Sequence, residues 1–325
     1  MVHAAMLWPV TRAPAAEPRR VVLVGKNRAA VAALETIRAA GDELACVVVD
    51  PGDTGEDGWQ PSLRRMAASS GDRIEAPSNL NDPAFVEILR SLDLDLLVSI
   101  QAAQIMRRPL LETPRFAAVN LHFGPLPLYR GVAPIAWAII NGETETAVTL
   151  HVIDPGIDSG PILASAPVAI GRDETARSLY DRCTQAAVDL FTTEWPRIRH
   201  GDLDGRPQAG EALYYNRHSI DFSRRAIGWE RDARDVANWI RAFIFPPLQL
   251  PHVTVAGSPI EVGAVGWDRD PHAGRPGEVL EVADGDVVVA APGGRVRLAD
   301  LTRDGAALTG SGLADAGFVP GLVLS

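Results

Sequence analysis

Apolar and polar residues follow two alternating patterns over the first two thirds of the chain. Short apolar runs, often β-branched, are typical of strands, and the longer segments between them have the 3.6-residue repeat of amphipathic helices. We expect strands at 21–25, 44–50, 94–100, 117–121 and 147–153, and helices at 27–40, 61–70, 83–92 and 134–141. Buried strands that alternate with helices indicate an α/β fold, with a doubly wound, mostly parallel sheet covered on both faces.

The pattern changes after residue 174. We expect a long amphipathic helix at 175–195, which Pro196 should end or kink, and another helix at 231–243. From residue 246, short apolar alternations are separated by Gly, Asp and Pro; they lie at 253–255, 287–290 and 296–298. This spacing predicts a small antiparallel β-barrel or sandwich.

The length of 325 residues has room for one large domain and one smaller one. We expect a loose leader at 1–19, an α/β catalytic domain at 20–204, a crossing linker and helix at 205–245, and a C-terminal β-barrel at 246–325. No apolar run approaches the roughly 20 residues of a membrane span. Cys46 and Cys183 provide neither a disulfide framework nor a metal site. We therefore expect a cytoplasmic protein with no membrane partner and no metal.

Polar residues with chemical potential gather between residues 120 and 160. Asn120 and His122 stand two apart where the strand 117–121 ends, so they face the same side. A loop follows, Pro125-Leu126-Pro127-Leu128-Tyr129-Arg130-Gly131, and then come Thr149-Leu150-His151 and Gly156-Ile157-Asp158-Ser159-Gly160. Ligands bind beyond the carboxyl ends of strands in such sheets. An amide, an imidazole and an acid that converge there can form a site for acyl transfer.

These motifs, in this order and at this spacing, resemble the signature of the folate-dependent formyltransferase family. That signature is Asn-x-His, Leu-Pro-x-(Tyr/Trp)-Arg-Gly-x-x-Pro, Thr-x-His and Gly-x-Asp-x-Gly, and the resemblance extends from about Val21 to the C-terminus. It implies a Rossmann-like catalytic domain, an OB-like C-terminal barrel, and transfer of a formyl group from 10-formyltetrahydrofolate to a primary amine. It also implies that Asn120, His122 and Asp158 are the catalytic residues.

The residue types fit that chemistry. An amine that attacks a formyl carbon generates an oxyanion, which the amide of Asn120 can stabilise. His122 can donate to the same oxygen as an imidazolium, or it can carry a proton from the incoming amine to the departing nitrogen. Asp158 would raise the pKa of His122 and stabilise its charged form. The structural alternative is that His122 satisfies a strand end and Asp158 caps a turn; the ordered set of motifs favours catalysis.

The resemblance implies further site residues. It places the pteridine of the folate between the loops 100–106 and 153–158, and the candidate contacts are Ile100, Gln101, Gln104, Ile105, Ile153, Gly156 and Ile157. Candidates for binding the acceptor are Tyr129, Arg130, Gly131 and Arg217. Arg130 suits an anionic group, but pairing with a local acid that holds the loop is an equal alternative. We expect His151 to be a structural histidine more than a site residue, and Trp137 to lie in the core.

The charge of the protein indicates which class of amine acceptor it can bind. The formal net charge is −10, Lys26 is the only lysine, and the loop 50–58 carries four acids and no base. Binding of tRNA needs basic patches that neutralise phosphates. We therefore expect a small-molecule amine, either a nucleotide-linked amino sugar or an amino or hydroxylamino acid of a siderophore or peptide pathway. The alternatives are formylation of methionyl-tRNA, hydrolysis of formyl-folate, and folate binding without catalysis. The sequence is also compatible with a homodimer.

Overall fold

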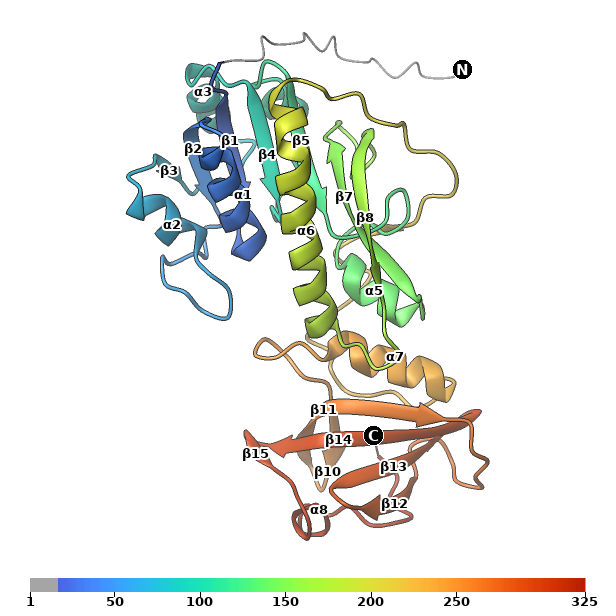
Figure 1. Ribbon diagram of the computed structural model, residues 1–325. Helices are drawn as coiled ribbons and strands as arrows, with labels where there is room; N and C mark the ends of the chain where they lie inside the picture. Colours follow the sequence, from blue (N-terminus) through green and yellow to red (C-terminus); the bar gives the residue numbers. More distant parts are fainter. Residues whose placement is uncertain (1–16, 325) are drawn as a thin grey trace. The chain divides into compact units, whose positions relative to one another are not determined.

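The computed structural model describes residues 17–324, so most of the leader expected at 1–19 lies outside the described residues (Figure 1). The chain forms two compact units. The first contains the described residues up to Gly131 together with Ala147–Val168 and Cys183–Tyr214, and the second contains Val132–Thr146, Ala169–Arg182 and the chain from Tyr215 onward. The domain boundaries that we expect from the sequence stay predictions.

A seven-stranded sheet forms the framework of the N-terminal part. Its order is β3-β2-β1-β4-β5-β7-β8. The strands are β1 (Arg20–Gly25), β2 (Glu43–Val49), β3 (Ile74–Glu75), β4 (Leu96–Ile100), β5 (Ala117–His122), β7 (Glu145–Val152) and β8 (Ile162–Ala169). Strands β1 to β5 pair in parallel, whereas β7 runs antiparallel to β5. The mostly parallel sheet predicted from the sequence is confirmed; β8 was not among the expected strands.

Helices cover both faces of this sheet. They are α1 (Asn27–Ala39), α2 (Leu63–Ser69), α3 (Pro83–Ser91), α4 (Arg108–Leu111) and α6 (Ala176–Arg199). Alternate residues of β1, Val22 and Val24, pack with Phe85 of α3 in one core cluster. Helix α1 packs against β1 and β2 outside that cluster. Figure 1 shows α1 and α6 side by side, and the hydroxyls of Thr36 and Thr192 lie 3.2 Å apart between them.

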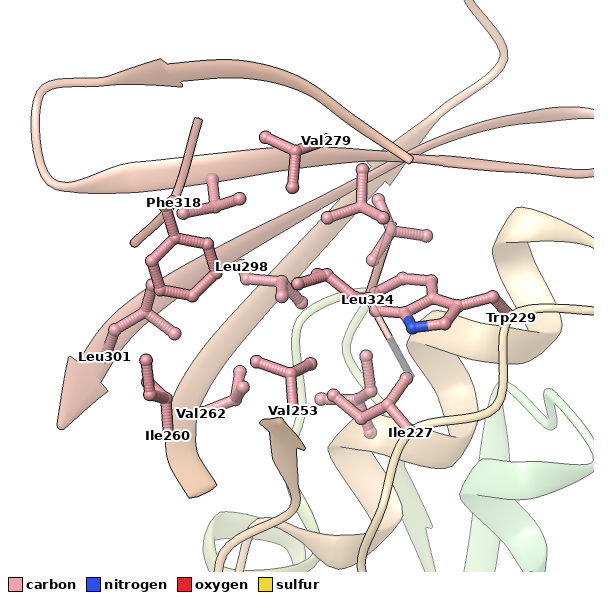
Figure 2. Close-up of a cluster of buried hydrophobic side chains, with 14 of the residues drawn as sticks. Ile227, Trp229, Val253, Ile260, Val262, Val279, Leu298, Leu301, Phe318 and Leu324 are labelled. Carbon is pink, nitrogen blue, oxygen red and sulfur yellow. The ribbon is translucent and has the colours of Figure 1, made fainter. Parts of the chain in front are cut away.

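The C-terminal part is an antiparallel sheet packed on a helix. Its order is β10-β11-β14-β13-β12, with β15 paired to β14. The elements are α7 (Ala233–Phe243), β10 (His252–Val255), β11 (Ser258–Asp268), β12 (Val279–Ala283), β13 (Asp286–Ala291), β14 (Gly294–Arg303), β15 (Ala306–Ala307) and α8 (Gly312–Asp315). Figure 2 shows Val262, Leu298 and Phe318 of its core pointing toward one another. The predicted C-terminal antiparallel β-domain is confirmed, although β11 and β12 were not expected individually.

Two expectations need correction. The helix expected to end or kink at Pro196 does not end there, because α6 continues to Arg199. Trp137 lies on α5 (Pro134–Ile140) and is half-buried, not in the core, because its ring stacks on Tyr215 at a centroid distance of 4.2 Å.

Two short strands, β6 (Arg130–Gly131) and β9 (Tyr214–Tyr215), form a separate small sheet. None of the helices within residues 17–324 is long and apolar enough to cross a membrane.

A buried network explains why α6 continues beyond its proline. Trp195 and Ile198 are fully buried, so the apolar face extends past the missing N–H of Pro196. The buried carboxylate of Asp42 accepts hydrogen bonds from the indole of Trp195 at 3.0 Å and from Nε and Nη2 of Arg199 at 2.8 and 2.6 Å. Tertiary contacts therefore hold the last turn, where local sequence preference would end the helix.

We predict that Asp42→Ala lowers the free energy of unfolding by about 3–5 kcal/mol, because it leaves the buried Trp195 indole and the partly buried Arg199 guanidinium without their acceptor. Urea denaturation measures the loss. The matched control is Glu43→Ala, which removes an exposed carboxylate paired with Arg20 and should cost less than about 1 kcal/mol. Equal effects of the two substitutions would contradict the importance of the network.

Candidate active site

The site is built on the pairing of β5 with β7. Asn120 and His122 lie at the carboxyl end of β5, as expected. The antiparallel register places His151 directly opposite Asn120, and Thr149 directly opposite His122. Residues two apart on a strand share a face, and opposed residues on neighbouring strands share it too. The motifs Asn-x-His and Thr-x-His therefore form one polar patch, although about thirty residues separate them in sequence.

Asp158 completes the patch from the loop after β7. Its Oδ2 lies 3.6 Å from Nδ1 of His122, and its Oδ1 lies 3.5 Å from Nε2 of His151. The N–H of Gly131 also donates to Oδ2, at 2.9 Å. The backbone of Asp158 is left-handed, with φ at 47°. This conformation is uncommon for a residue other than glycine, and such strain gathers at functional sites. The structure thus brings together all three candidate catalytic residues.

The hydrogen bonds define the state of His122. Its Nε2 lies 2.9 Å from the carbonyl oxygen of Tyr129. Because a carbonyl can only accept, Nε2 carries a hydrogen, and Nδ1 of the neutral ring presents its lone pair on the side of Asp158. Burial lowers the pKa of His122 below its ordinary value, although Asp158 and the Tyr129 carbonyl act in the opposite direction. Burial therefore favours the neutral form of His122.

Asp158 is ionised beside this ring. Burial alone would raise its pKa, but the contacts with the His151 and His122 rings and the N–H of Gly131 together lower the pKa to about 2. A neutral imidazole next to a fixed carboxylate can accept a proton and then hold it as a stabilised imidazolium. Of the two roles that the sequence left open for His122, this geometry favours proton transfer.

His151 has a larger part than the sequence suggested. Its Nδ1 lies 2.9 Å from the carbonyl oxygen of Val152, so Nδ1 carries a hydrogen. Its Nε2 lies 3.1 Å from Nδ2 of Asn120 and can accept one amide hydrogen there. This contact fixes the orientation of the amide and leaves the second Nδ2 hydrogen for another acceptor. The Thr-x-His motif was the available signal, but only the strand register connects it to Asn120.

The motif loop serves the site mainly through its backbone. The hydroxyl of Thr149 donates to the carbonyl of Gly124 at 2.7 Å and anchors the start of the loop. Tyr129 is buried, with φ at 57°, and supplies its carbonyl to His122. Arg130 donates from Nε and Nη2 to Oε1 of Gln208, at 3.1 and 2.6 Å. This contact fits the loop-holding role, although the partner is an amide and not an acid, and the role of Arg130 in acceptor binding stays a prediction.

The expected folate contacts lie on two segments: Ile100, Gln101, Gln104 and Ile105 at and after the end of β4, and Ile153, Gly156 and Ile157 after β7, which runs antiparallel to β5. Gln101 and Gln104 line a small, open pocket that Lys26 and Asp50 also border. Both glutamine side chains are used within the protein, since Oε1 of Gln101 accepts from Asn27 at 3.1 Å and Oε1 of Gln104 accepts from the N–H of Leu80 at 2.9 Å.

The remaining candidates differ in exposure. Ile100 is fully buried at the end of β4, whereas Ile105 is 60% exposed. Ile153, Gly156 and Ile157 lie on the loop that carries Asp158. The assignment of all these residues to folate binding stays a prediction. Arg217 is exposed and belongs to the second unit, so its role in acceptor binding stays a prediction as well. Within residues 17–324, no group of three or more His, Cys, Asp or Glu is arranged to hold a metal ion.

Comparison with known proteins identifies the family. Residues 19–194 match the family described as formyl transferase, and residues 219–315 match its C-terminal domain. The chain belongs to the formyl transferase family. Curated relatives include methionyl-tRNA formyltransferases from Aromatoleum aromaticum, 34% identical over 89% of this chain and 91% of the relative, and from Geobacter metallireducens, 29% identical over 88% and 91%. The predicted family and its one-carbon transfer chemistry are confirmed.

Solved structures of similar proteins include enzymes that act on sugars. An N-formyltransferase from Helicobacter canadensis, in complex with folinic acid and dTDP-3-aminofucose, has a TM-score of 0.73 and 25% identity over 87% of this chain and 100% of that one. The sugar 3N-formyl transferase WlaRD, with dTDP and 5-N-formyl-THF, has a TM-score of 0.71 and 26% identity over 87% and 98%. Sequence relatives and structural neighbours thus differ in acceptor, so membership of the formyl transferase family alone leaves the acceptor open.

We predict that Asp158→Asn lowers the pKa of His122, because the carboxylate raises that pKa and the amide cannot. In the wild type, the pKa of His122 should already lie below its ordinary value of 6.5. Histidine titration followed by NMR measures both values without any substrate. His252, whose pKa burial also lowers, provides an internal control and should not move. An unchanged or raised pKa of His122 in the variant would contradict the assigned electrostatics.

Proposed function

We propose that the protein transfers a formyl group from a formyl-folate, with 10-formyltetrahydrofolate as co-substrate, to a primary amine, using Asn120, His122 and Asp158. The observation that carries this proposal is the convergence of an imidazole, a carboxylate and an oriented amide at the carboxyl end of β5. Formyl transfer needs a proton acceptor, a counter-charge for it, and a donor for the oxyanion. Solved relatives in complex with folinic acid and with 5-N-formyl-THF support a folate as the formyl donor.

Each residue has a defined task in this reaction. A C–N bond forms between the acceptor amine and the formyl carbon. Asn120 donates its second Nδ2 hydrogen to the formyl oxygen as negative charge develops there. His122 takes the proton that the attacking amine loses, at Nδ1, and Asp158 stabilises the resulting imidazolium. The bond from the formyl carbon to the folate nitrogen then breaks, and His122 returns the proton to that nitrogen.

The acceptor that we propose is a small-molecule amine, either an amino sugar carried on a nucleotide or an amino or hydroxylamino acid. Its main support is charge. The net charge is −10, and the only lysine, Lys26, lies 3.5 Å from the carboxylate of Asp50. Several arginines of the C-terminal domain also pair with carboxylates: Arg225 with Glu261, Arg269 with Asp232, Arg295 with Asp268, and Arg297 with Asp286. Paired arginines give little net positive potential for a phosphate backbone.

Methionyl-tRNA is the second candidate acceptor, because the curated relatives with 34% and 29% identity act on it by name. The acidic loop argues against it less strongly than the sequence suggested. Asp53 turns toward its own loop and accepts from the hydroxyl of Ser62 at 2.5 Å and from the N–H of Arg64 at 2.9 Å, and Asp57 pairs with Arg65. These carboxylates hold the loop together, and their charge is partly compensated. Of the four acids, Glu56 and Asp57 are exposed.

We predict that His122→Ala and Asp158→Asn each lower kcat by about 10²–10⁴-fold, because proton transfer then lacks its acceptor or its counter-charge. The double variant should be little worse than either single variant, as expected for residues that act as a unit. Asn120→Ala should lower kcat by about 10²–10³-fold and keep its affinity for the formyl-folate. Steady-state kinetics and folate titration check these values. His200→Gln, which alters a histidine in contact with Arg199, is the control; near-normal turnover in His122→Ala would refute the assignment.

We predict turnover of a small amine, and no formylation of methionyl-tRNA at physiological salt. The measurement is formyl release from 10-formyltetrahydrofolate with a panel of nucleotide-linked amino sugars, amino acids and hydroxylamino acids, run beside methionyl-tRNA. Arg130→Gln and Arg217→Gln should raise KM for an anionic acceptor if those residues bind it. Efficient formylation of methionyl-tRNA with a steep dependence on salt would show that the acceptor is methionyl-tRNA and not a small amine, and would leave the proposed formyl-transfer chemistry unchanged. Formate production without any acceptor would instead indicate hydrolysis.

A further inference from the structure

One glutamine outside the sequence motifs connects the two loops that shape the site. The Nε2 of Gln208 donates to the carbonyl oxygens of Asp158 and Gly160, both at 2.8 Å. Its Oε1 accepts from Nε and Nη2 of Arg130. Both amide hydrogens and the amide oxygen are therefore used, and the side chain is half-buried. A side chain with this many specific partners has one orientation, so it can hold the groups that it contacts in fixed positions.

The segment that carries Gln208 is fastened along its length, and we call residues 205–213 the strap. Arg206 and Ile162 exchange both of their backbone hydrogen bonds, each at 2.8 Å. Gly205 lies so close to Pro161 that an added Cβ would be 2.8 Å from the proline Cβ. At the other end, the carbonyl of Leu213 accepts from the N–H of Arg130 at 2.9 Å. The strap is thus bound to the loop of Asp158 on one side and to the motif loop on the other.

The contacts of Gln208 bear directly on the carboxylate of Asp158. The left-handed backbone of Asp158 is intrinsically unfavourable and needs external contacts to hold it. Gly131 holds the carboxylate, and Gln208 holds the carbonyl of the same residue. We propose that Gln208 is a positioning residue that keeps the Asp158 carboxylate between His122 and His151 during formyl transfer. This inference rests on the proposed function, because it assigns Gln208 to the reaction that Asp158 supports there.

Two substitutions separate this role from simple bracing of Arg130. Gln208→Glu keeps the length of the side chain and offers Arg130 a carboxylate, but it removes both N–H donors to Asp158 and Gly160. Gln208→Ala removes every contact. We expect both variants to lower kcat by at least about 10-fold and to change KM for the formyl-folate little, because a misplaced Asp158 affects the reacting geometry and not the binding of the co-substrate. Kinetics with an amine that the wild type formylates measures these effects.

A second readout is independent of the acceptor. If Asp158 moves away in the variants, His122 loses the carboxylate that raises its pKa, so its pKa should fall in both variants. NMR titration of the free protein measures this fall. The control is Gln185→Ala, which removes a glutamine amide that also accepts from an arginine, Arg28, and donates to an acid, Asp189, on the surface. It should leave kcat and the His122 titration unchanged.

The outcomes are distinguishable. Normal kcat and a normal His122 titration in Gln208→Glu would overturn the proposal and reduce Gln208 to a partner of Arg130. A lower melting temperature with unchanged kcat and His122 titration would overturn it in favour of a purely structural role. If the wild type formylates no amine, the proposed function fails, but the titration still decides whether Gln208 positions Asp158. If Gln208→Ala does not fold, Gln208→Glu alone carries the test.

Discussion

The antiparallel register between β5 and β7 is the constraint on which the candidate site depends. It sets Asn120 against His151 and His122 against Thr149, so that two short motifs become one surface. A slip of one residue would turn the side chains of one strand to the opposite face and would separate the amide from its imidazole partner. The buried strands of the sheet fix this register, since their apolar positions must stay in the core. The register that keeps the apolar positions of the sheet buried is therefore the same register that aligns the residues of the site.

The electrostatics of the site follow from its burial. The pKa of His122 is lowered because desolvation outweighs the nearby carboxylate, and the pKa of Asp158 is lowered because its polar partners outweigh desolvation. Two residues that supply groups to this pair, Tyr129 and Asp158, have left-handed backbones. The strap and the motif loop offset that strain with hydrogen bonds to both chain segments. The polar network thus keeps the carboxylate in place before any substrate binds.

Prediction from the sequence succeeded where a local pattern of apolar residues is enough to specify a secondary-structure element. Strands β1, β2, β4 and β5 were found within two residues at each end, because apolar runs of that length are buried in a sheet. It failed where residues remote in sequence determine the local structure. Helix α6 passes through Pro196 because the Asp42 network holds its end, and Trp137 leaves the core to stack on Tyr215. The acidic loop looked like a repulsive surface, but its carboxylates accept hydrogen bonds within the loop and from the start of α2.

The sequence by itself determined the family, the two-part α/β and β organisation, and the identity of Asn120, His122 and Asp158 as candidates, because ordered motifs and apolar periodicity are local properties of the chain. Only the tertiary structure decided that burial lowers the pKa of His122, that His151 orients Asn120, and that Gln208 connects the loops of Asp158 and Arg130. Protonation depends on burial, and orientation depends on hydrogen-bond partners from remote segments. Neither quantity is encoded at a single position.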